Sequence, residues 1–211
     1  DLLFVLVLNM GIPGAAVSTV LAQLLSGICC LLGIRRIPGL SMRREDCRAD
    51  RELIEQELRL GLPLCLQNMI TSFGGLVVQS VINGFGVLFI AGYTAANKLY
   101  GLLEIAASSY GYAMSSYAGQ NMGAGKRKRI GAGLRAANLI GTATAYLMSA
   151  VMILFGKQIL SCFLSGDAAT VEAALAIGFR FLCVLAIFFP LLYILYITRA
   201  CVQGMGDGVF P

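Results

Sequence analysis

Glu104 is the acidic residue of this 211-residue sequence that lies well inside an apolar stretch, and Lys98 precedes it by six positions. The charged form of a carboxylate is costly in an apolar environment, so Glu104 could exchange a proton or bind a cation there. The alternative is a structural partner for a lysine or arginine, and both interpretations stay open. Lys98 lies on a different face of a straight helix. It could meet an anionic substrate, extend to the membrane surface, or neutralise Glu104 if the helix bends.

Other polar side chains recur at helical spacing in three apolar stretches, so each stretch has one polar face. Polar groups at membrane depth usually face a bundle interior or a water-filled cavity. The three faces therefore predict one central polar cavity. The alternative is that the amides and hydroxyls only tie helices together. The candidate pathway residues are Asn68, Ser72, Gln79, Asn83, Asn97, Lys98, Glu104, Ser108, Tyr196 and Arg199. The same faces include Gly75, Gly101, Ser115 and Gln203.

The composition is that of a membrane protein. Hydrophobic residues make up 58% of the sequence and charged residues 13%, and the mean hydropathy is +0.80. Soluble domains carry about 25% charged and about 45–50% apolar residues. The excess is explained if side chains must be apolar toward lipid as well as toward neighbouring helices. The predicted fold class is therefore all-α, a polytopic bundle of transmembrane helices.

The sequence offers little for catalysis. It holds no histidine, and its seven cysteines form no CxxC pair. Zinc, general-base and triad chemistry based on histidine is therefore excluded, and the cysteines resemble small buried hydrophobes. We predict no enzyme, no catalytic residue, no metal site and no cofactor. The net charge of +5 does not indicate nucleic-acid binding, because the basic residues lie in loops between apolar stretches.

Apolar stretches divide the chain into spans. We predict a helix tail at 1–10, then spans at 15–34, 60–85, 88–118, 130–156 and 170–203, the last kinked at Pro190. Between the first two spans, Asp50 can cap a short surface helix that runs into the next span. The predicted organisation is the end of a first lobe at 1–34, an inter-lobe linker at 35–59 and an incomplete second lobe at 60–211. The chain is expected to be a fragment.

Loop charges predict the orientation of these spans. Residues 35–59 carry seven Lys and Arg and residues 126–135 carry five, whereas the loops on the opposite side carry Lys157 alone. Short cytoplasmic loops are enriched in Lys and Arg. The loops at 35–59 and 122–130 are therefore expected to be cytoplasmic.

The segment from Gly111 to Arg129 joins an apolar helix, a run of small and amide residues, and four consecutive positive charges. Its central string, GQNMGAGK at 119–126, resembles the end of the second helix of the second lobe in the multidrug and toxic compound extrusion (MATE) family. Segments at 61–63, 95–99 and 203–207 resemble the family in the same order. The residues taken as family motif or hinge are Gly119, Gln120, Asn121, Gly123, Gly125, Pro190, Gln203, Gly204 and Asp207.

The resemblance implies two six-helix lobes around a central cleft, with this chain holding the end of helix five to the start of helix eleven. It implies a secondary antiporter of the cell (inner) membrane. Such a protein exports cationic or amphipathic compounds in exchange for inward H+ or Na+ by alternating access. Its partners would be membrane lipid, small organic cations or amphipaths, and the first-lobe helices outside this sequence.

The sequence departs from the sodium-coupled members of the family. Some of them carry an acidic residue in helix seven, where this sequence has Thr71 between Asn68 and Ser72. The same members carry an aspartate in helix ten, and the span at 170–203 has none. Coupling would then rest on Glu104 or on an acidic residue of the first lobe.

Three functions other than drug transport are open to a polytopic membrane protein. A flippase for lipid-linked sugars, from the same superfamily, would need a more cationic cavity than Lys98, Arg180 and Arg199 provide. An integral-membrane enzyme would need clustered acidic or metal-binding residues at the membrane surface, where Asp207 stands alone. A scaffold that transports nothing would leave the polar faces unexplained.

Overall fold

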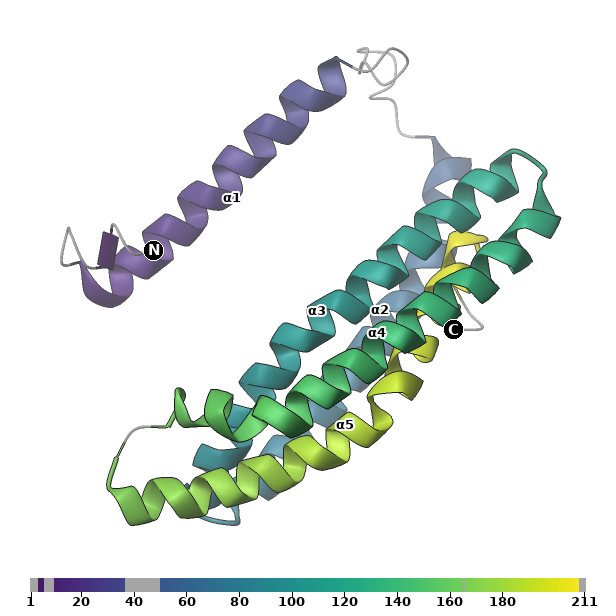
Figure 1. Ribbon diagram of the computed structural model, residues 1–211. Coiled ribbons are helices and arrows are strands. Elements are labelled where there is room, and N and C mark those ends of the chain that lie inside the picture. Colours follow the sequence, from purple (N-terminus) through teal and green to yellow (C-terminus); the bar gives the residue numbers. More distant parts are fainter. Residues whose placement is uncertain (1–3, 6–9, 37–49, 165, 209–211) are drawn as a thin grey trace. The chain divides into compact units, whose positions relative to one another are not determined.

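The computed structural model describes residues 4–5, 10–36, 50–164 and 166–208. No strand occurs among these residues, which confirms the predicted all-α fold (Figure 1). The chain divides into two compact units, residues 1–54 and 55–211. The helices are α1 at Gly11–Arg35, α2 at Arg51–Asn83, α3 at Val87–Gly123, α4 at Arg127–Ser161 and α5 at Ala168–Gly204.

Helix α1 is the long helix of the first unit, and it confirms the span predicted at 15–34. It is apolar and long enough to cross a membrane. The hydroxyls of Ser18 and Thr19 both donate to the carbonyl oxygen of Ala15, at 2.9 and 2.8 Å. These polar groups are therefore satisfied within the helix, as a lipid environment requires.

Helix α2 begins at Arg51, inside the stretch predicted to be a linker. The Asp50 carboxylate accepts a 2.9 Å hydrogen bond from the backbone N–H of Glu52 and so caps the helix as predicted. The helix then continues through Pro63 to Asn83. The predicted surface helix and the following span are thus one continuous element. Residues 37–49, the rest of the predicted linker, lie outside the described residues.

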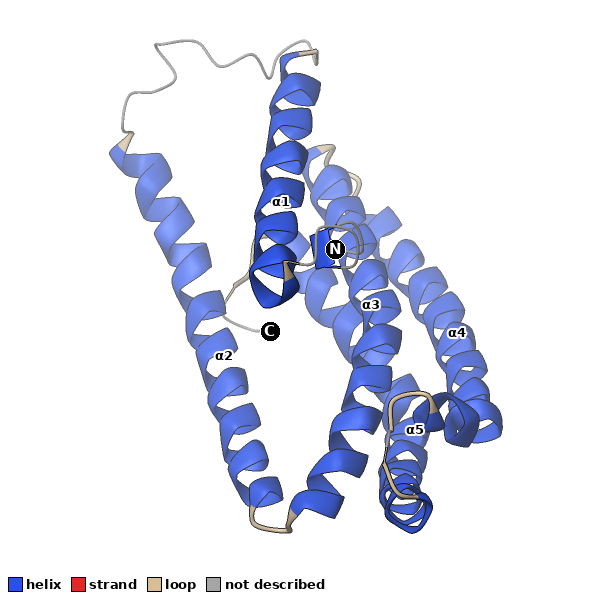
Figure 2. Cartoon of the chain, turned by 90° about the vertical axis from the view of Figure 1, so that its left-hand side faces the viewer, coloured by secondary structure: helices blue, strands red, loops and turns tan. Residues whose placement is uncertain are grey.

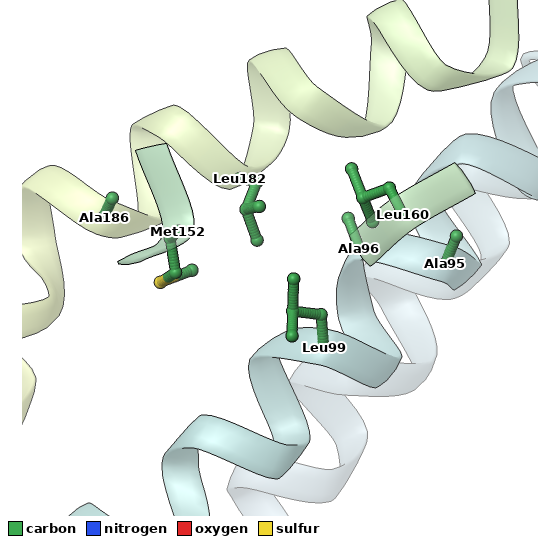
Figure 3. Packing of buried hydrophobic residues seen from close by; sticks show 7 residues of the cluster. All are labelled: Ala95, Ala96, Leu99, Met152, Leu160, Leu182 and Ala186. Atoms are coloured by element: carbon green, nitrogen blue, oxygen red, sulfur yellow. The ribbon is translucent and has the colours of Figure 1, made fainter. Parts of the chain in front are cut away.

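Helices α3, α4 and α5 pack against one another. Short turns join each helix to the next, so α3 and α5 run in the same direction and α4 runs opposite to both (Figure 1). Apolar side chains of all three helices meet in the core. Figure 3 shows one such cluster, made of Ala95, Ala96, Leu99, Met152, Leu160, Leu182 and Ala186.

Helices α3 and α5 approach each other closely near both ends because glycines lie at the contacts. A Cβ atom added to Gly178 would lie 2.6 Å from the carbonyl oxygen of Gly92. One added to Gly204 would lie 2.8 Å from the Cα atom of Ser115. Small residues let helices pack backbone to backbone in a membrane, where van der Waals contact drives association. The parallel pair α3–α5 is therefore tightly packed along its length.

Helix α3 is less apolar than its neighbours. The described helices that are long and apolar enough to cross a membrane are α1, α2, α4 and α5. The polar residues of α3, among them Asn97, Lys98 and Glu104, lower its hydropathy. Yet α3 has 37 residues and packs against both α4 and α5. The span predicted at 88–118 is therefore a long helix packed against two apolar helices, and whether it crosses a membrane stays a prediction.

The glycine-rich string predicted as a hinge is mostly helical. Helix α3 continues through residues 119–123. The Asn121 amide donates to the Tyr117 carbonyl at 2.8 Å, and a Cβ atom on Gly119 would lie 3.3 Å from the carbonyl oxygen of Gly204. Packing against α5 thus keeps the string in the helix. The chain turns only at residues 124–126, where Gly125 has a φ of 70° that favours glycine.

Helix α5 remains helical through Pro190, and Figure 1 shows its axis changing direction along its length. A proline removes one backbone hydrogen bond and crowds the preceding turn, which accounts for a bend at this position. The helix ends at Gly204, and the chain turns at Met205 and Gly206.

Helix α2 does not pack along its length against the three-helix core but is attached to it at a few points. A short turn at 84–86, in which Gly86 has a φ of 90°, connects it to α3. Figure 2 shows the two helices separating from this turn. Near its other end, a Cβ atom on Gly208 would lie 2.7 Å from the carbonyl oxygen of Leu60. Between these points most α2 side chains are exposed, and Ile82 is buried.

Candidate functional site

A polar cavity of about 490 Å³ lies between α2 and the α3–α5 pair. These are the three helices whose polar faces predicted a cavity. Five of the ten lining residues carry an amide or a small hydroxyl side chain, and the others are two tyrosines, a glycine, an alanine and one charged residue, Arg199. The lining residues are Asn68, Thr71, Ser108, Gly111, Tyr112, Ser115, Tyr196, Arg199, Ala200 and Gln203.

Arg199 connects α5 to α2 across this cavity. Its Nη2 atom donates a hydrogen bond to Oε1 of Gln67, and both residues are half-buried. Within the described part of the chain, no acidic residue forms an ion pair with Arg199. Among the described residues, the guanidinium thus has a neutral amide as its hydrogen-bond partner.

Glu104 lies on α3 beside the cavity. Its Oε1 atom accepts a 2.5 Å hydrogen bond from the hydroxyl of Tyr196, and Tyr100, one turn earlier on α3, lies beside the same carboxylate. No lysine or arginine among the described residues forms an ion pair with Glu104. Neutralisation by Lys98, one of the alternatives left open above, is therefore not seen among the described residues, where the neighbours of the carboxylate are Tyr196 and Tyr100.

Four predicted pathway residues lie away from this cavity. The Gln79 amide donates a 3.0 Å hydrogen bond to Asn83, and both are exposed near the end of α2. Asn97 and Lys98 are exposed on α3, because the other face of the helix, which includes Leu99, packs into the core. The prediction that all the polar faces meet in one cavity is thus too broad. Only the part of α3 beyond Glu104 lines it.

The face of α2 that lines the cavity differs slightly from the predicted one. Ser72 faces a separate, more apolar hollow of about 600 Å³, which it shares with Asn68. Thr71 lines the polar cavity, and Gln67 binds Arg199 beside it. The spacing of Gln67 and Thr71, four residues apart, was the sequence signal for this second polar stripe. Tyr112 was also missed, since an aromatic residue in an apolar span is unremarkable.

The predicted motif residues near the end of α5 face different spaces. Gln203 lines the polar cavity. Asp207, just beyond the helix, lines another hollow of about 510 Å³, together with Arg59 near the start of α2. Within the motif at 203–207, Gln203 therefore lines the polar cavity and Asp207 lines the second hollow.

Comparison with known proteins identifies the family. The MatE family model matches residues 63–211, which include every residue that lines the polar cavity. The chain belongs to the MatE family. It is 33% identical over 209 residues to the probable multidrug resistance protein YpnP of Bacillus subtilis (strain 168). It is 28% identical over 211 residues to the probable multidrug resistance protein YoeA of the same organism. No solved structure matches the chain significantly.

The chain spans less than half the length of these relatives. The alignments cover 97% and 96% of this chain but 44% of each relative. The family resemblance drawn from the string at 119–126 is confirmed. MatE is a family of transporters, and four apolar helices of sufficient length make this chain part of a multi-pass membrane protein.

Proposed function

We propose that this MatE chain forms part of a secondary antiporter that exports cationic or amphipathic compounds in exchange for inward H+ or Na+. The observation that carries the proposal is a polar cavity between α2 and the α3–α5 pair with the carboxylate of Glu104 beside it. Pockets for drug-sized molecules measure roughly 300–1,000 Å³, and this cavity measures about 490 Å³. The names of YpnP and YoeA, both probable multidrug resistance proteins, agree with export of such compounds.

In this proposal Glu104 takes up the coupling ion, and Tyr196 relays its occupancy to the cavity. Tyr196 binds the Glu104 carboxylate and also lines the cavity. A proton or Na+ on the carboxylate weakens it as the acceptor of this hydrogen bond, so the Tyr196 hydroxyl is held less firmly. The bound compound and the ion then influence each other through the side chain of Tyr196. Coupling between two sites requires such a mutual influence.

The attachment of α2 supports alternating access. Helices α3 and α5 are in backbone contact near both ends, whereas α2 is held by the turn at 84–86, by Leu60 against Gly208, and by the Arg199–Gln67 hydrogen bond. Movement of α2 against a stiff α3–α5 pair would open and close the cavity between them.

The setting of this antiporter follows from the same proposal. The basic loops at 35–59 and 122–130 would be cytoplasmic, in the inner membrane of the cell, because of their Lys and Arg content. The partners would be membrane lipid, the transported compound and first-lobe helices of the same protein. The second lobe would comprise residues 60–211 and the inter-lobe linker residues 35–59.

The alternatives have less support. Lys98 and Arg180 are exposed and do not line the cavity, so Arg199 alone would have to hold the diphosphate of a lipid-linked sugar. For an enzyme, the described residues contain no group of three or more His, Cys, Asp or Glu that could hold a metal ion.

The test is transport by the full-length protein in proteoliposomes. An imposed H+ or Na+ gradient should drive accumulation of at least one fluorescent amphipath, tested in cationic, neutral and anionic forms, against its own gradient. Liposomes without protein serve as the control. The proposal fails if neither gradient drives movement of cationic, neutral or anionic amphipaths.

A further inference from the structure

Arg199 carries the one charge in the lining of the polar cavity. In the described chain its hydrogen-bond partner is the neutral amide of Gln67, and no carboxylate pairs with it. A cation withdrawn from water without a counter-charge is costly, and an anion in the cavity would offset that cost. A guanidinium presents parallel N–H donors that match the two oxygens of a carboxylate or sulfonate.

The opposite charge of Glu104 is kept out of this lining. Its carboxylate accepts the Tyr196 hydroxyl, and Tyr196, not Glu104, lines the cavity. Asn68, Thr71 and the other lining residues are neutral. A ligand in the cavity therefore faces the guanidinium, while the carboxylate beside it remains available for a small ion.

We propose that this cavity binds amphipathic ligands through a single anionic group, a carboxylate or sulfonate, held by Arg199. The inference rests on the proposed function, because it names the class of compound that the same site accepts. Tyr112 and Tyr196 offer ring surface to the apolar part of the ligand. One guanidinium balances one negative charge, so a monoanion suits the cavity better than a diphosphate.

The test is ligand binding to the purified full-length protein in detergent, without any ion gradient. The three probes share one ring system and differ in charge: 2-naphthoate, neutral 2-naphthamide and cationic 2-naphthylmethylammonium. Isothermal titration calorimetry should show 2-naphthoate binding at least about tenfold more tightly than the other two, because charge-assisted bidentate hydrogen bonds favour it. Arg199→Gln should remove this preference, and Arg199→Lys should keep part of it.

Two further variants separate the local charge from general damage. Arg180→Gln removes an exposed arginine of the same helix and should leave the preference unchanged. Gln203→Glu keeps Arg199 but adds a carboxylate to the cavity lining one turn away. The Gln203→Glu variant should weaken 2-naphthoate binding. If Arg199→Gln cannot be purified in a monodisperse form, Gln203→Glu alone tests whether the charge in the cavity sets the preference for the anion.

The inference is overturned if the wild-type protein prefers the ammonium probe or shows no preference, or if Gln203→Glu leaves the preference intact. These outcomes do not depend on transport. If 2-naphthoate binds as expected but no compound moves in proteoliposomes, the proposed antiport fails and the binding class stands. If cations are transported and 2-naphthoate does not bind, the inference alone fails.

Discussion

The hydroxyl of Tyr196 donates a 2.5 Å hydrogen bond to the carboxylate of Glu104, although the two residues lie 92 positions apart in sequence. Tyr196 is at the same time part of the cavity lining. A ligand that displaces the Tyr196 ring would change the hydrogen bonding of Glu104. Conversely, an ion on Glu104 would weaken its hydrogen bond with the Tyr196 hydroxyl. This pair is therefore where the proposed coupling of ion and compound can be tested directly.

Replacement of Glu104 by glutamine should abolish gradient-driven transport in proteoliposomes while ligand binding persists. The amide keeps the shape of the side chain and can still accept from Tyr196, but it can neither exchange a proton at neutral pH nor offer Na+ a negative charge. Tyr196→Phe should slow transport without abolishing it, because the carboxylate remains.

Glu172→Gln is the matched control, since Glu172 is an exposed glutamate on α5. Its transport should equal that of the wild type. Full gradient-driven activity in Glu104→Gln would place the coupling residue elsewhere, and the first lobe would be the next region to search.

Substitution of Gly178 by alanine should lower the melting temperature of the purified protein. The new Cβ atom would lie 2.6 Å from the carbonyl oxygen of Gly92, so α3 and α5 would have to separate. Overpacking of this kind costs about 1–3 kcal/mol. Thermal unfolding followed by fluorescence of a thiol-reactive dye in detergent would measure the loss.

Gly101→Ala is the control for this prediction, because nothing lies within 4 Å of a Cβ atom built on Gly101. Alanine in place of glycine within a helix stabilises by about 0.5–1 kcal/mol. Equal melting temperatures for the two variants would show that the α3–α5 contact is looser than described.

Cross-linking α2 to the end of α5 should stop transport. Cysteines at Leu60 and Gly208 would be adjacent, because a Cβ atom on Gly208 would lie 3.4 Å from the Cα atom of Leu60. That Cβ atom would also crowd the Leu60 carbonyl oxygen at 2.7 Å, so the reduced form of the same variant is the control for the substitution itself. If α2 moves against the α3–α5 pair, the oxidised variant is inactive and a reductant restores it. The assay is gradient-driven transport before and after reduction.

A cross-link within the α3–α5 pair should be harmless. The rings of Tyr93 and Phe181 have centroids 5.0 Å apart, so cysteines at these positions can be joined by a short bifunctional reagent. Loss of transport in this second variant as well would argue that α3 and α5 move relative to each other, against the proposed division into moving and stationary parts.

The two ends of α3 should lie on opposite sides of the membrane. In a background without reactive native cysteines, Phe85→Cys and Lys128→Cys should react with a membrane-impermeant maleimide from opposite sides. Cys162, in the turn that follows α4, should react from the same side as Phe85→Cys. Labelling of Phe85→Cys and Lys128→Cys from one side would show that α3 does not cross, despite its packing between α4 and α5.

The candidate site was predictable in part. Helical spacing singled out Asn68, Ser108 and Ser115, because a period of 3.6 residues identifies which side chains share a face. Helical spacing does not show which part of one helix lies opposite another helix. Asn97 and Lys98 share the α3 faces that were singled out, yet they lie outside the cavity.

The sequence alone determined the all-α membrane fold, the approximate spans and the family, because apolar length and local motifs depend on neighbouring residues. Tertiary packing decided the rest. It showed that Glu104 meets Tyr196 rather than Lys98, and that Arg199 faces a neutral amide. It also placed the string at 119–123 in the last turns of helix α3. Each of these depends on which helix lies opposite and in which register, and close backbone approach at glycines sets that register.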